Sequence, residues 1–192
     1  MFDLKIQRNN QAFTLTEALV ASFIFIIVCA ITLSIYIAGV DTWESGRLQA
    51  DLQAQARVAL NNMVSELRNA TRTSSQNPSP NLIIPSAPNN KNITFNLPAD
   101  KDNNGLLTDA SGIIEWDTNN AIQYQYIPGQ EQLRRLEKGN QVILANNVSD
   151  IQFIDHGIDS SLSLNELKII LNLNKTTPKQ RNISVTLSTI VN

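Results

Sequence analysis

The sequence predicts an α+β protein in which one long N-terminal helix packs on an antiparallel β-sheet. Three observations indicate this class. Residues 18–40 carry no charged side chain, residues 41–73 repeat apolar positions every three or four residues, and the chain after residue 92 alternates apolar and polar residues. Because the helical pattern comes first and the strand patterns follow it, we expect separate helix and sheet layers.

The apolar run at residues 18–40 is long enough to cross a membrane. At about 1.5 Å per residue, these roughly 23 positions make a helix of about 34 Å, and a hydrocarbon core is about 30 Å thick. Lys5 and Arg8 precede the run, whereas Asp41 and Glu44 follow it. The positive-inside rule therefore predicts a single pass, with a cytoplasmic N-terminus and an exported C-terminal part.

Glu17 is an acidic residue at the very start of this run. An ionised acid costs about 2.5 to 3.5 kcal/mol at the centre of a spanning helix and less near its end, so such a residue indicates a function. Phe13 lies one helical turn before Glu17, and a cut after Ala12 would free a Phe13 amine that can pair with the acid. The alternative is that Glu17 only marks the interface end of an ordinary signal anchor.

The segment Ala12-Phe13-Thr14-Leu15-Thr16-Glu17, with the apolar run behind it, resembles the leader and N-terminal methylation motif of the type IV prepilin family. That pattern has a short basic leader, a small residue at the cut, a methylatable Phe and a Glu in the first turn. The resemblance implies that prepilin peptidase cleaves after Ala12 and methylates the Phe13 amine, and that Phe13 and Glu17 act in assembly. Ala12 stands where the family usually has Gly, so the efficiency of processing stays open.

The segment after the run has a second resemblance. Trp43, Ser45-Gly46-Arg47, residues 53–60 and Glu66-Leu67-Arg68 are similar to J-type minor pseudopilins of type II secretion and to W-type minor pilins. This implies a subunit of a hetero-oligomeric tip complex with other major and minor pilins or pseudopilins, built on an inner-membrane assembly platform. The sequence does not separate a type II secretion pseudopilus from a type IV pilus. An unrelated stalk helix is the alternative.

The predicted organisation has five parts. They are a cytoplasmic leader (1–12), a spanning half of the helix (13–40), an amphipathic periplasmic half (41–73), a Pro- and Asn-rich loop (74–92) and a sheet domain (93–192). The last two strands are expected to form a hairpin. Strands are predicted at residues 93–97, 113–116, 122–126, 133–136, 142–144, 148–153, 167–173 and 183–189, with a short extended piece at 82–84.

One loop has the spacing of a metal site. Asp100, Asp102 and Asn104 precede Gly105, and Asp109 follows, which is typical of the start of a calcium loop. The twelfth position is Ser111 rather than the bidentate Glu of an EF-hand. A calcium site with these four ligands and a solvated Asx-rich turn are both open interpretations.

The remaining composition does not indicate an enzyme, a resident cofactor or a nucleic-acid partner. The chain has one histidine, His156, one cysteine, Cys29, within the apolar run, and a net charge of −2. Two other functions stay open. In the first, the exported domain is a tip-displayed binding module, such as an adhesin or a DNA-uptake receptor, and its local basic cluster is Arg134, Arg135 and Lys138. In the second, the chain is a membrane-anchored sensor outside any filament.

Overall fold

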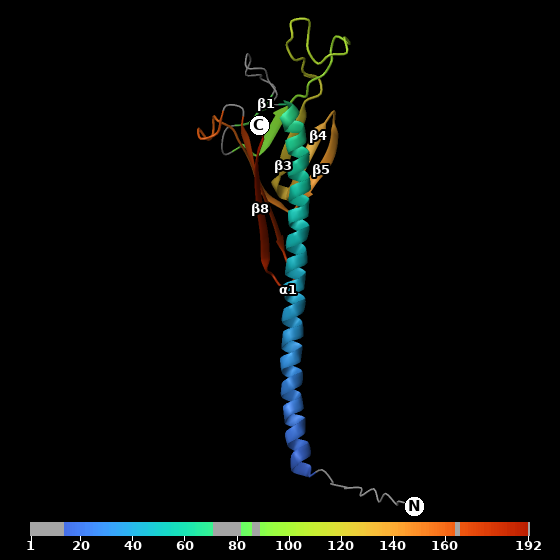
Figure 1. The fold of residues 1–192 in the computed structure, drawn as a ribbon, viewed down its shortest axis with the longest axis vertical. Coiled ribbons are helices and arrows are strands. Elements are labelled where there is room, and N and C mark those ends of the chain that lie inside the picture. Colours follow the sequence, from blue (N-terminus) through green and yellow to red (C-terminus); the bar gives the residue numbers. More distant parts are fainter. Residues whose placement is uncertain (1–13, 71–81, 86–88, 164–165, 192) are drawn as a thin grey trace, which may run out of the picture. The chain divides into compact units, whose positions relative to one another are not determined.

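A computed structural model describes residues 14–70, 82–85, 89–163 and 166–191. Within these ranges the chain forms one long helix, α1 (Leu15–Ala70), followed by strands only, apart from a short 3-10 helix (Figure 1). This order confirms the predicted α+β class. The chain divides into two compact units between Glu44 and Ser45.

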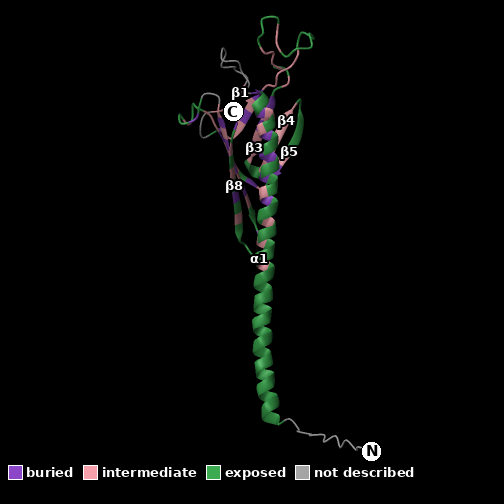
Figure 2. Ribbon diagram, in the orientation of Figure 1, coloured by how far each residue is buried: buried purple, intermediate pink, exposed green. Residues whose placement is uncertain are grey.

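The first unit contains the N-terminal part of α1. Its side chains from Thr14 to Val40 are all exposed, including every large apolar one (Figure 2). The few hydroxyl groups are satisfied within the helix, because Ser22 donates to the carbonyl of Leu19 at 2.9 Å and Thr32 to that of Val28 at 2.8 Å. A helix with this length, composition and internal bonding is able to span a membrane.

The second unit begins with the C-terminal part of α1, which is amphipathic as predicted. The predicted helix end at residue 73 lies outside the described residues, and within them α1 extends to Ala70. Its buried stripe recurs every three or four residues and comprises Leu52, Ala56, Ala59, Leu60, Met63, Leu67 and Ala70. These side chains belong to the same hydrophobic core as the buried residues of the strands.

The strands form two antiparallel sheets, whereas the alternating pattern alone suggested one. The first has the order β1 (Leu82–Ile83), β2 (Asn92–Phe95), β3 (Ile122–Ile127), β4 (Gln132–Glu137) and β5 (Asn140–Asn146). The second has the order β6 (Val148–Ile154), β7 (Leu167–Thr176) and β8 (Asn182–Val191). In the first sheet, the 3-10 helix η1 (Pro128–Gln130) joins β3 to β4.

The division between the sheets falls at one residue. Asn147 lies between β5 and β6 with a φ of 58°, in the left-handed region that Asn tolerates better than most residues. This turn ends the first ladder and directs β6 to β7. The sequence pattern gives the period of each strand, but it carries no information about this change of partner.

One predicted strand is absent, and the other strand predictions are confirmed to within a few residues. Residues 113–116 make only isolated bridges, Thr108 with Ile114 and Pro98 with Trp116. The backbone bonds of this segment are divided between two others, since Glu115 donates to the Leu107 carbonyl at 2.9 Å and accepts the N–H of Ala99 at 3.0 Å. The apolar residues Ile113 and Ile114 resembled a strand, but the N–H of Ile113 donates to the Asp109 carboxylate at 3.0 Å, and no continuous ladder forms.

The core of the second unit lies between the helix stripe and the inward faces of both sheets. Alternate residues of β3 and of most of β7 are buried, as the period of two predicted. The rings of Phe95 in β2 and Tyr124 in β3 pack with centroids 5.3 Å apart and planes tilted by 44°. The final hairpin joins β7 to β8 in the predicted place, with Thr176 opposite Asn182.

Candidate functional site

The start of α1 is the first candidate site, and two residues organise it. The backbone N–H of Glu17 donates to Thr14 Oγ1 at 3.3 Å, while Thr14 donates to Glu17 Oε2 through its N–H at 3.0 Å and its hydroxyl at 2.9 Å. This reciprocal arrangement is a capping box, which satisfies backbone donors that a helix start leaves free. The sequence Thr-x-x-Glu is the local signature of such a cap, a role of Glu17 that adds to the assembly and interface roles expected from its position.

The carboxylate of Glu17 has capacity beyond the cap. Both bonds from Thr14 use Oε2, so among the described residues nothing donates to Oε1, which is able to accept another donor. The next helical turn on the same face, Val20 and Ala21, is apolar and exposed. Ala12 and Phe13, the two predicted processing residues, lie outside the described residues. The described geometry therefore provides a lone acid on an apolar helix end that is able to accept a donor from another group.

The predicted calcium loop is the second candidate site. The carboxylates of Asp100, Asp102 and Glu115 have oxygens within 4.8 Å of one another. Glu115 was missed by sequence reasoning, because it lies in a segment predicted as a strand and outside the ligand spacing of the loop. Its approach follows from the backbone bond of Ala99 N–H to the Glu115 carbonyl at 3.0 Å, which brings the two ends of the loop together.

Asn104 and Asp109, the other two predicted ligands, have structural bonds of their own. The Asn104 amide donates to Asp102 Oδ2 at 2.8 Å, and its Oδ1 accepts the N–H of Leu106 at 2.7 Å. The Asp109 carboxylate is not in the cluster and caps a separate turn by accepting the N–H of Ser111 at 2.8 Å.

The loop fits a hard divalent cation only in part. Calcium takes about six to eight oxygen ligands, and three carboxylates supply between three and six, depending on whether each binds through one or both of its oxygens. Asp100 already accepts the N–H groups of Asn104 at 3.1 Å and Gly105 at 2.8 Å, and Glu115 accepts that of Lys101 at 2.6 Å. These bonds hold the turn in place in the way that an Asx-rich loop does by itself.

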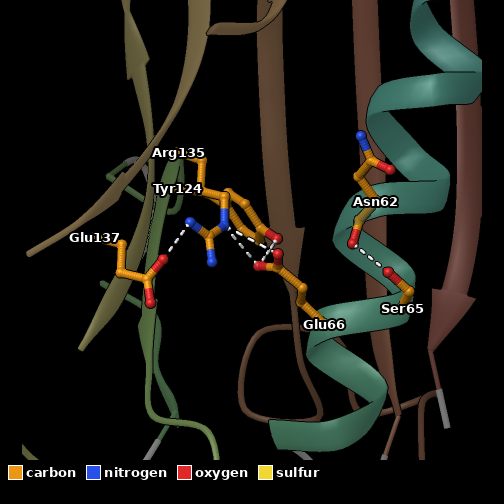
Figure 3. A network of polar contacts seen from close by, with 6 residues as sticks. All are labelled: Asn62, Ser65, Glu66, Tyr124, Arg135 and Glu137. Carbon is orange, nitrogen blue, oxygen red and sulfur yellow. Dashed lines mark hydrogen bonds and ion pairs between the residues drawn. The ribbon is translucent and has the colours of Figure 1, made fainter. Parts of the chain in front are cut away.

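A third cluster joins α1 to the first sheet. Arg135 of β4 donates from Nε to both carboxylate oxygens of Glu66, at 3.0 and 2.9 Å, and from Nη1 to Glu137 at 2.8 Å (Figure 3). The Tyr124 hydroxyl of β3 donates to the same Glu66 at 2.7 Å. One carboxylate on the helix thus fixes two neighbouring strands.

The pKa shifts in this cluster favour the protonation states that make these bonds. Burial raises the pKa of the Tyr124 hydroxyl far above its usual value, and the hydrogen bond to the charged Glu66 raises it further. Burial lowers the pKa of Arg135, but the hydrogen bonds and charges of Glu66 and Glu137 outweigh it, so the net pKa is raised. Tyr124 therefore stays a donor and Arg135 stays a cation at neutral pH.

The predicted basic cluster is divided by the strand. Successive side chains of β4 point to opposite faces, so Arg134 and Arg135 do not share a surface. Arg134 donates to Gln132 at 2.7 Å and Gln141 at 2.9 Å, whereas Arg135 binds Glu66. This arrangement does not provide a continuous basic patch for a nucleic acid.

Comparisons with models of protein families, with curated proteins and with solved structures find no match to this chain.

Proposed function

We propose that this chain is an assembly subunit of a type IV pilus-like filament, a minor pseudopilin or minor pilin. The observation that carries the proposal is the start of α1. A single carboxylate, Glu17, stands at the end of an exposed apolar helix, directly behind a sequence that resembles a prepilin peptidase site. The fold supports it, since the resemblance implies a long N-terminal helix whose second half packs on antiparallel strands.

In this proposal the apolar part of α1 lies in the membrane before assembly and in a bundle of helices after it. Before assembly, the apolar surface of residues 18–40 is covered by inner-membrane lipid, and the second unit is on the periplasmic side. After cleavage, the Phe13 amine pairs with Glu17 of the same or a neighbouring subunit. Within an apolar bundle, either group alone would be a buried charge without a partner. Pairing of the acid with the amine therefore stabilises the contact between subunits.

The partners in this proposal are prepilin peptidase, other major and minor pilins or pseudopilins, and an inner-membrane assembly platform. The filament is either a type II secretion pseudopilus or a type IV pilus, in which the chain initiates or caps growth. The tip-receptor alternative draws no support from the basic cluster, because Arg135 is engaged by Glu66 and Glu137.

Mass spectrometry of the mature N-terminus tests the proposal. The full chain is co-expressed with a prepilin peptidase in a bacterial inner membrane, and a catalytically inactive peptidase serves as the control. We expect a product that begins at N-methylated Phe13 only with the active enzyme. Ala12→Gly restores the residue usual in the family and is expected to raise the processed fraction. A product that still begins at Met1 with the active enzyme would contradict the proposal and favour the membrane-anchored sensor.

A further inference from the structure

The two sheets of the second unit have four edge strands, β1, β5, β6 and β8. An edge strand presents N–H and C=O groups that are free to pair with another chain, and proteins usually protect such edges. The usual protection is a very short strand, a bulge, a charge or proline on the strand, or a covering segment. The four edges differ sharply in this respect.

Three of the edges are protected. β1 has only two residues. β5 has a bulge at Leu144, because Leu133 pairs with Ala145 while Arg134 pairs with Ile143.

Covering segments protect β6. The N–H of Phe153 donates to the Asn90 carbonyl at 2.8 Å, and the N–H of Val148 donates to that of Glu131 at 2.8 Å. The Lys91 ammonium also lies 2.9 Å from the Asp150 carboxylate of this strand.

Within the part of the chain that the structure describes, the outer edge of β8 has none of these features. Asn182–Val191 spans ten residues, with no charged residue, no proline and no glycine. Its pairing with β7 runs from Asn182 to Val191 without a shift in register. No other strand in the described part of the chain pairs with it, and Figure 1 shows β8 as an outer strand of its sheet.

The hairpin determines which backbone groups face outward. The N–H of Thr177 donates to the Arg181 carbonyl at 2.8 Å, so these two residues form a hydrogen-bonded pair. Hydrogen-bonded pairs alternate along an antiparallel ladder, which directs the backbone groups of odd-numbered β8 residues to β7. The even-numbered residues point their N–H and C=O groups outward, and their side chains are exposed; they are Asn182, Ser184, Thr186, Ser188 and Ile190.

We propose that the outer edge of β8 is a docking site for an extended, uncharged strand of another protein, which adds a fourth strand to the three-stranded sheet. A row of outward N–H and C=O groups is recognised by an extended backbone. The hydroxyls of Ser184, Thr186 and Ser188 offer no counter-charge, so a charged side chain opposite them would be unpaired. Thr and Val opposite them fit, because hydroxyl and β-branched cross-strand pairs are stabilising.

A peptide-binding measurement on the full chain in lipid nanodiscs tests this proposal. The probe is a fluorescent, terminally blocked peptide of ten alternating Val and Thr residues, with two Lys residues at one end for solubility. Fluorescence anisotropy measures its binding. We expect saturable binding to the wild type, and a loss of binding when N-methyl groups replace the N–H groups on one edge of the peptide.

Substitutions at Thr186 locate the site. Thr186→Pro removes an outward N–H and leaves the bonds to β7 in place, so we expect the affinity to fall by about tenfold or more. Thr186→Lys, a second variant in case the proline disturbs folding, places a charge on the edge and is expected to weaken binding as well. Thr186→Val is the matched control, because it keeps a β-branched, uncharged residue, and its affinity should equal that of the wild type.

Three results would overturn the proposal. They are the absence of binding to the wild type, equal binding to the wild type and to the folded Pro and Lys variants, and self-association of the chain through β8 that Thr186→Lys abolishes. The last result would assign the edge to a second copy. The test does not depend on processing at Ala12, so its outcome is independent of the proposed filament function.

Discussion

At the scale of single residues, Glu17 has two roles that substitution can separate. Its Oε2 caps the helix through Thr14, while Oε1 is left for a partner. A glutamine retains a carbonyl oxygen for the cap but loses the negative charge. The cap is therefore affected far less than an ionic contact with another subunit would be.

We predict that Glu17→Gln leaves the helix and membrane insertion intact but reduces recovery of partner pilins or pseudopilins. The expected reduction is about tenfold, which corresponds to about 1.4 kcal/mol for a lost charge-assisted contact. Affinity purification of the chain with its partners from membranes measures it. Glu44→Gln, which also removes one acid from α1, is the matched control and should have no effect. Normal recovery with Glu17→Gln would remove the central argument for assembly.

The contact between Glu66 and Arg135 is a second residue-scale feature with a measurable effect. Their side chains are only 28% and 19% exposed, so solvent screens the pair incompletely. Removal of the cation leaves Glu66 half-buried with Tyr124 as its remaining described donor. We predict that Arg135→Met lowers the free energy of unfolding of the second unit by about 1 to 3 kcal/mol.

Urea denaturation in detergent, followed by circular dichroism, measures this loss. Arg134→Met is the matched control, because Arg134 is adjacent in sequence but donates to Gln side chains on the opposite face. Its effect should stay within about 0.5 kcal/mol. Equal losses in the two variants would show that the contact to the helix is unimportant for stability.

At the scale of elements, α1 changes its environment along its length. Its first part exposes apolar side chains on all sides, while its second part buries one stripe in the core. A helix of this type is stable in the second unit because of packing rather than because of propensity. The stripe should therefore be sensitive to side-chain volume and the opposite face insensitive to it.

We predict that Met63→Ala destabilises the second unit by about 2 to 5 kcal/mol, since Met63 is 0% exposed and its truncation leaves a cavity. Val58→Ala is the control on the same helix, where the residue is 58% exposed, and should change stability by about 0.5 kcal/mol or less. Thermal unfolding followed by circular dichroism compares the two. A similar change in both variants would mean that the stripe is not the packed face.

At the scale of the whole molecule, the charges on either side of the apolar run predict the membrane topology. Lys5 and Arg8 before the apolar run and Asp41 and Glu44 after it favour an N-terminus that stays in the cytoplasm. We predict that protease added to spheroplasts digests the second unit and leaves the spanning segment in the membrane. Inside-out vesicles are the control and should protect the second unit. Protection in spheroplasts would place this unit in the cytoplasm and exclude assembly on the periplasmic side.

The sequence by itself determined most elements of this protein, and the strand expected at residues 113–116 is the exception. The uncharged run at residues 18–40 requires a helix in which no polar backbone group is left unpaired, and the three-and-four repeat after it requires a helix with one buried face. The period of two predicted the strands, because alternate side chains must reach the core. The capping box of Thr14 and Glu17 was also encoded locally, by a Thr and a Glu three residues apart.

Only the tertiary structure decided which elements and side chains meet. The break at Asn147 divides the strands between two sheets, and Glu115 joins Asp100 and Asp102 because bonds between distant residues close their loop. Arg135, which the sequence placed in a basic surface cluster, binds Glu66, a residue 69 positions earlier in the chain. The physical reason is that periodicity and caps depend on neighbours along the chain, whereas strand partners, ion pairs and free edges depend on how the whole core packs.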